Sequence, residues 1–135
     1  GLGAVHGFAA PIGGRFDAPH GAVCAALLPH VMAANILALR ARAPRHDALN
    51  RFDEIARIVT GRGDARADDG VRWVRDLVIR LQIPPLATYA IGSEDVPAIV
   101  QAAMKASSMK ANPLPLEVDE LGGVLLRAIG GEPAC

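Results

Sequence analysis

Hydrophobic residues recur every three or four positions through much of the chain, which is the spacing of one face of a helix. After residue 46 the pattern predicts four helices, whose apolar stripes are Leu49, Phe52, Ala56 and Val59; Val71, Val74, Val78 and Leu81; Val96 to Met104; and Val118, Leu121, Leu125 and Ala128. No segment alternates steadily between apolar and polar residues, as a half-buried strand would. The predicted fold class is therefore all-α, a bundle of five to six helices forming a single domain over residues 1–135.

Two further helices are predicted before residue 40. A short helix over residues 2–10 should stop at Pro11 and the Gly13-Gly14 pair. A longer one should open at Pro19, with Asp17 as its cap, and run to about Leu39. This second helix is apolar nearly all round, which is typical of the most buried helix of a fold. Its longest clean apolar run, 22–28, is far shorter than the roughly 20 residues of a membrane span, so we expect a core helix and no membrane partner.

The amino-acid composition excludes some classes of function. The 135 residues are 51% hydrophobic and 21% charged, as in a folded domain with a real core. Fourteen basic residues balance fourteen acidic ones and aromatics are 4%, so neither nucleic acid nor a charged membrane surface is an expected partner. Two cysteines, Cys24 and Cys135, make no disulfide framework, and no targeting segment is visible, so a cytoplasmic location is expected.

Two histidines near the start are the main candidates for chemistry. His6 falls on the first predicted helix and His20 at the entry to the second, on either side of the Pro/Gly break. Neutral imidazole is the commonest metal ligand, and two elements that each bring one histidine can form half of a metal site. The spacing matches no compact zinc pattern, and no cysteine pair supports it. Two helix-end histidines bonded to backbone carbonyls are therefore an open alternative.

Other polar side chains have structural interpretations. His30 lies inside the apolar helix and is expected to find a backbone partner. His46 lies in a polar loop and is expected to be solvated, while Cys24 is interpreted as core packing. A solvated loop and a helix cap are predicted for three aspartates, Asp64, Asp68 and Asp69.

The segments around Val5-His6-Gly7 and Pro19-His20-Gly21 resemble the second signature of the iron-containing (group III) alcohol dehydrogenase family. Residues 26–32 and the loop 109–113 are similar to the family as well, so the resemblance covers essentially the whole chain. It implies the later part of the C-terminal helical domain found in dehydroquinate synthase-like and iron alcohol dehydrogenases.

The resemblance also implies a function. Family members hold a metal, usually Fe(II) and alternatively Zn, between this domain and an N-terminal dinucleotide-binding domain, and transfer hydride between a small alcohol or aldehyde and NAD(P). One Asp and three His bind the metal, and by motif His6 and His20 would be the last two ligands. The dinucleotide-binding domain and the helix with the Asp and first His are absent from these 135 residues, so no catalytic or cofactor-binding residue is assigned and the chain alone is expected to be inactive. With two of the four ligands, it is also expected to hold no metal, or metal only at partial occupancy. Many members carry a further His where this chain has Ala10.

The alternative is a non-catalytic helical scaffold or interaction module. If the helical domain is incomplete, its central helix should also expose an apolar patch. We therefore expect self-association, with contacts at four apolar residues of that helix, Leu27, Val31, Met32 and Leu39.

Overall fold

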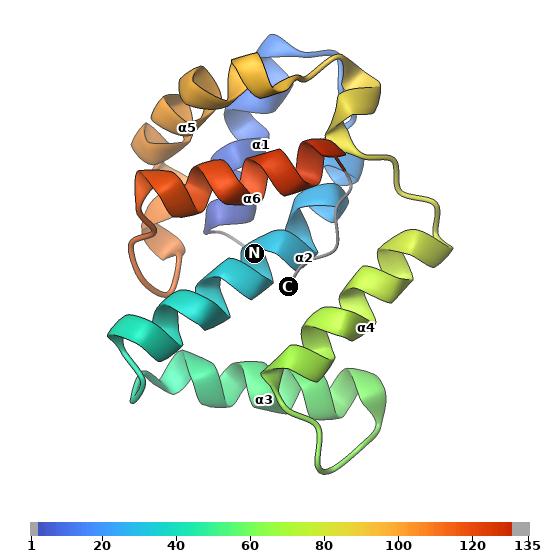
Figure 1. Ribbon diagram of the computed structural model, residues 1–135, viewed down its shortest axis with the longest axis vertical. Helices are drawn as coiled ribbons and strands as arrows, with labels where there is room; N and C mark the ends of the chain where they lie inside the picture. The colour runs from blue at the N-terminus through green and yellow to red at the C-terminus, as the bar shows by residue number, and fades with distance from the viewer. Residues whose placement is uncertain (1–2, 131–135) are drawn as a thin grey trace.

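The computed structural model describes residues 3–130, and it confirms an all-α fold (Figure 1). Six α-helices follow one another: α1 (Ala4–Arg15), α2 (His20–Arg42), α3 (Asp47–Thr60), α4 (Ala67–Arg80), α5 (Val96–Lys105) and α6 (Val118–Gly130). Three short 3₁₀ helices lie in the connections: η1 (Leu86–Tyr89), η2 (Ser93–Asp95) and η3 (Ser107–Ala111). No strand occurs within the described residues. Leu2, the predicted first residue of the first helix, and Cys135 lie outside them.

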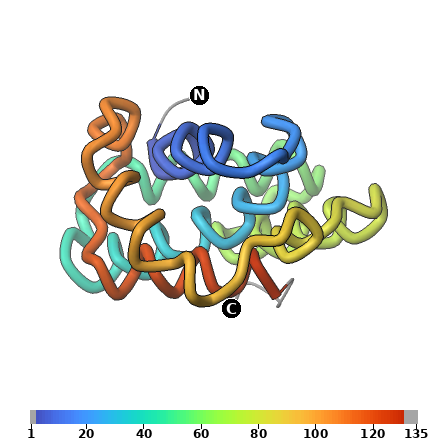
Figure 2. Tube along the Cα trace, turned by 90° about the horizontal axis from the view of Figure 1, so that it is seen from above, coloured from blue at the N-terminus to red at the C-terminus, as the bar shows by residue number. Residues whose placement is uncertain are grey.

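Helix α2 is the centre of the bundle. It contacts α1, α3, α4 and α6, and α1 and α6 lie on opposite sides of it (Figure 2). By length and composition α2 could cross a membrane, with a mean hydropathy of 1.9 over its most apolar window, but 61% of that window is buried inside the fold. Burial by four neighbouring helices accounts for its apolarity, as predicted for a core helix.

The predicted contact residues for self-association are wrong. Leu27, Val31, Met32 and Leu39 are all buried within the bundle. A helix that is apolar on every side does not reveal which face its neighbours cover, and here they cover the face that carries these four residues. The large apolar side chains that α2 does expose are Leu28 and Leu37.

The first helix is longer than predicted. Helix α1 continues through Pro11 and both glycines to Arg15, and Phe16 closes it with a backbone N–H bond to the Ile12 carbonyl. Ile12 is completely buried, so packing of this side chain favours one further helical turn despite the lost hydrogen bond at Pro11. At the entry to α2, Pro19 itself is the N-cap residue and no side chain caps the helix, so the predicted cap by Asp17 is also wrong.

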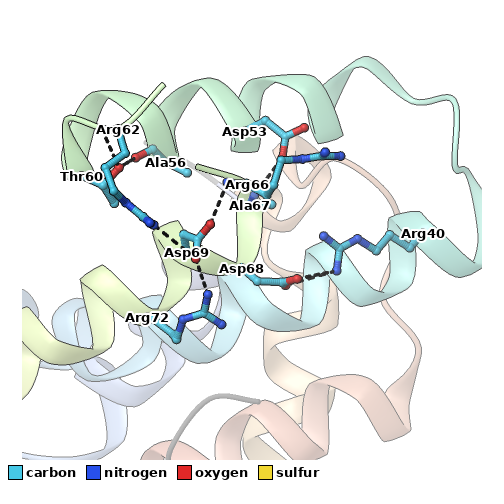
Figure 3. Close-up of polar contacts among 10 residues, drawn as sticks. All are labelled: Arg40, Asp53, Ala56, Thr60, Arg62, Arg66, Ala67, Asp68, Asp69 and Arg72. Carbon is cyan, nitrogen blue, oxygen red and sulfur yellow. Dashed lines mark hydrogen bonds and ion pairs between the residues drawn. The ribbon is translucent and has the colours of Figure 1, made fainter. Parts of the chain in front are cut away.

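A set of polar contacts fixes α3 and α4 to each other and to α2 (Figure 3). Asp69 accepts a hydrogen bond from the backbone N–H of Arg66 at 2.9 Å, and Asp53 accepts one from that of Ala67 at 2.8 Å. Asp68 pairs with Arg40 of α2 at 3.0 Å. The predicted helix-cap role is thus confirmed for Asp69. Further along, Gly70 packs directly against Ala56, where an added Cβ would come within 3.2 Å of the alanine methyl group.

The start of α1 is hydrogen-bonded to the segment that follows α5. Gly3 precedes α1 with a φ of 103°, which favours glycine, and its N–H bonds the Ser108 carbonyl at 2.8 Å. The next backbone N–H, of Ala4, bonds Oδ1 of Asn112 at 3.2 Å. These contacts set the direction of the helix that carries His6.

Candidate metal centre

His6 and His20 face each other across the junction between α1 and α2. His6 is the third residue of α1, and His20 is the first residue of α2. Their ring centroids are 5.7 Å apart and the ring planes are inclined at 46°. The structure therefore brings together the two histidines that the sequence singled out.

Local structure explains how the two rings meet. Phe16 ends α1 in an extended conformation, and the N–H of Ala18 bonds the Phe16 carbonyl at 3.0 Å, so the chain turns within a few residues. Beside His6, Gly7 lies against Met109, where a Cβ on the glycine would approach the Met109 methyl carbon to 2.7 Å. Glycine at this position thus allows α1 to lie close to η3.

Cys24 lies beside the two histidines, which the sequence analysis did not predict. It lies one turn after His20 on α2, and its Sγ is 3.5 Å from the His20 Nε2. One donor atom from each of His6, His20 and Cys24 lies within 4.8 Å of the other two. Cys24 is half-buried, and burial raises the pKa of its thiol. Cys24 also packs against the hydrophobic core, as predicted. Its nearness to His20 is an additional feature, which the i, i+4 spacing on a helix already indicates.

The donor set fits a divalent transition metal. Two imidazoles and a thiol are ligands that such ions accept, at about 2.0–2.1 Å for nitrogen and 2.3 Å for sulfur. An ion at these lengths from both rings lies about 3.2 Å from each ring centroid, so rings 5.7 Å apart are within reach of one ion. The Nδ1 atom of His6 is also buried and has no hydrogen-bond partner among residues 3–130. A polar atom in that state is costly unless something binds it.

The other histidines lie away from this cluster. His46 is not simply solvated, because its Nδ1 accepts a hydrogen bond from the Ala48 N–H at 3.0 Å and so caps α3. His30 is buried in α2, but its Nδ1 has no partner within the described part of the chain, contrary to the expected backbone bond. Burial, and to a smaller extent the positive charge of Arg127, lower the pKa of His30 to about 4. Ala10, one turn after His6 on α1, is exposed and offers no polar group.

Residues 1–129 match the sequence model of the C-terminal part of the Fe-containing alcohol dehydrogenase family. The chain belongs to this family. Lactaldehyde reductase of Escherichia coli K12 is 31% identical over 127 residues, which are 90% of this chain and 31% of the reductase. Alcohol dehydrogenase 4 of Schizosaccharomyces pombe is 31% identical over 129 residues, 95% of this chain and 29% of the relative.

Solved structures of family members have the same helical fold. The alcohol dehydrogenase from Oenococcus oeni superposes with a TM-score of 0.78 at 28% identity, over 94% of this chain and 32% of that one. The iron-containing alcohol dehydrogenase from Thermococcus thioreducens superposes with a TM-score of 0.77 at 25% identity, over 97% of this chain and 32% of that one. The chain thus spans about a third of the length of these family members, and it corresponds to their C-terminal helical domain.

Proposed function

We propose that these residues form the metal-binding side of an NAD(P)-linked, metal-dependent alcohol dehydrogenase that interconverts a small alcohol and its aldehyde or ketone. The observation that carries the proposal is the meeting of His6 and His20, from two different helices, at a ring separation of 5.7 Å. Membership of the Fe-containing alcohol dehydrogenase family supports the same assignment.

Within this proposal His6 and His20 are the metal ligands contributed by the chain. The ion is Fe²⁺ or Zn²⁺, and when bound it supplies Lewis acidity toward a hydroxyl or carbonyl oxygen of the substrate. His6 is held by the packing of Gly7 against Met109, and His20 by the first turn of α2. Both rings are therefore held on rigid elements, and precise ligation would require this.

The 135 residues alone are proposed to bind metal weakly, at no more than partial occupancy, and not to oxidise an alcohol. Hydride transfer requires the nicotinamide to be positioned against the substrate carbon, and positioning is a large part of what such an enzyme contributes. Nucleotide-binding sites of this kind use a glycine-rich turn between a strand and a helix. The described residues 3–130 contain no strand to supply one. The proposed location is the cytoplasm.

Self-association remains a separate proposal, now with different contact residues. With the predicted four buried, contacts between copies would use exposed side chains such as Leu37, which is 67% exposed. Sedimentation of a dilution series tests this, because a chain that stays monomeric at every concentration contradicts it.

The metal assignment is tested by titrating the purified chain with Zn²⁺ in a calorimeter. Removing a residue that only hydrogen-bonds a metal ligand weakens metal binding by about 10–100-fold. His6→Asn and His20→Asn each remove a ligand itself, so each should weaken Zn²⁺ binding by a larger factor. His46→Asn is the matched control, since asparagine also caps a helix and the residue lies outside the cluster. Unchanged affinity in both His6→Asn and His20→Asn would overturn the assignment.

A further inference from the structure

We propose that Cys24 is a third metal-binding side chain of this centre, so that the chain presents a His6–His20–Cys24 donor set. The inference rests on the proposed metal site and adds a ligand whose chemistry differs from that of the two imidazoles. Thiolate is a soft ligand, and it favours Zn²⁺ over harder ions such as Mn²⁺.

The distance between the donor atoms of His20 and Cys24 matches that between two ligands of one zinc ion. Two ligands that share a tetrahedral zinc ion, one sulfur at 2.3 Å and one nitrogen at about 2.05 Å, lie about 3.6 Å apart. The Sγ of Cys24 and the Nε2 of His20 are 3.5 Å apart. The helix thus already holds the two atoms at the separation that one ion would impose.

The three side chains come from two helices and meet in one cluster. His20 and Cys24 are one turn apart on the same face of α2, and His6 comes from α1. The three donor atoms lie within 4.8 Å of one another, and none of the three residues is fully buried. An ion can therefore enter the cluster from solvent and still have coordination positions open for further ligands.

The thiol of Cys24 has an alternative role as a hydrogen-bonding partner of His20. Without an ion, the Sγ of Cys24 and the Nε2 of His20 are at hydrogen-bond distance, and the tautomer of the ring decides which of the two atoms donates. If an ion occupies Nε2, this hydrogen bond is lost and the sulfur is left beside the ion. On binding, the S–H bond breaks, a sulfur–metal bond forms and the proton leaves to solvent, with no change in oxidation state.

Cobalt(II) is the probe that separates these roles, because a thiolate ligand gives a sulfur-to-cobalt charge-transfer band in the near ultraviolet. All proteins carry Cys135→Ser, so that Cys24 is the one thiol in the chain. The arms are this background, Cys24→Ser, and the double variant His6→Asn/His20→Asn, each checked for unchanged helicity by circular dichroism.

The expected result is a charge-transfer band in the background protein that is absent from both other arms. Cys24→Ser should also lose more than about tenfold in Zn²⁺ affinity and clearly less in Mn²⁺ affinity. Cobalt uptake without the band, with the same affinity in Cys24→Ser, overturns the thiol ligand and leaves the histidine pair intact. A band that survives in the double variant places the thiol in another site and also overturns the inference. If the background protein takes up no cobalt, both this inference and the proposed metal site fail.

Discussion

Asn35 and Asn112 exchange two amide hydrogen bonds although 77 positions separate them in the chain. Nδ2 of Asn112 donates to Oδ1 of Asn35 at 2.7 Å, and Nδ2 of Asn35 donates to Oδ1 of Asn112 at 3.2 Å. Asn112 also donates to the Leu114 carbonyl at 2.8 Å and accepts from the Ala4 N–H. One side chain therefore joins the central helix, the start of α1 and the segment before α6.

Asn112→Ala should destabilise the fold by about 2–3 kcal/mol, because it leaves the buried amide of Asn35 without its partner. Urea unfolding followed by circular dichroism measures the change. Asn50→Ala on the exposed side of α3 is the matched control, with an expected change within about 0.5 kcal/mol. Equal stability of the two variants would show that the amide pair contributes little.

The extended α1 makes a prediction about its glycines. Gly13 is exposed and helical, and a Cβ there would meet nothing within 4 Å. Gly13→Ala should therefore raise the free energy of unfolding by about 0.5–1 kcal/mol, since alanine loses less backbone freedom than glycine on entering a helix.

Gly61→Ala is the contrasting variant. It also has open space around it, but its φ of 71° is left-handed, so alanine should cost about 1–2 kcal/mol there. If Gly13→Ala destabilised the fold as much as Gly61→Ala, residue 13 would not be helical and α1 would end near Pro11.

His30 should make stability depend on pH. Its pKa is about 4 in the folded chain against an ordinary value of 6.5, so below pH 6.5 the unfolded chain binds a proton that the folded chain does not. The contribution of His30 to the free energy of unfolding is fully present above pH 6.5 and falls as the pH decreases to about 4. Below that pH it changes no further. At about 1.4 kcal/mol per pKa unit, the loss is about 3 kcal/mol.

The measurement is the urea midpoint at pH values between 7 and 4 for the wild-type chain and His30→Gln. Glutamine cannot take up the proton, so the variant should lose clearly less stability on acidification. Asn50→Ala, which changes an exposed residue of α3 without adding or removing a titrating group, should follow the wild-type curve across the same range. Parallel curves for wild type and His30→Gln would contradict the assigned role of His30.

Hydrophobic spacing predicted the four helices after residue 46, because each amphipathic stripe has a neighbour to bury it, and together with the positions of Pro and Gly it predicted the two earlier ones. It did not predict the end of α1, where burial of Ile12 extends the helix past Pro11 and the glycine pair that normally end one. It also did not predict which side of α2 is covered, because an all-round apolar helix carries no such information. The pairing of Asn35 with Asn112 depends on tertiary contacts that no local pattern encodes.

The metal site was predictable to a different degree. The spacing of His6 and His20 alone was a weak signal, and the family resemblance is what selected them. The structure then places the two rings side by side. The nearness of Cys24 to both histidines could be seen only in the three-dimensional arrangement. Its position four residues after His20 on a helix does place those two residues on one face.

The most direct test of the account is a crystal structure of the zinc-loaded chain with anomalous diffraction data collected at the zinc edge. The account predicts one anomalous peak between α1 and α2, about 2.0–2.2 Å from one ring nitrogen of His6 and one of His20. A peak at any other site, or a peak bonded to one of these histidines while the other points away, would contradict it.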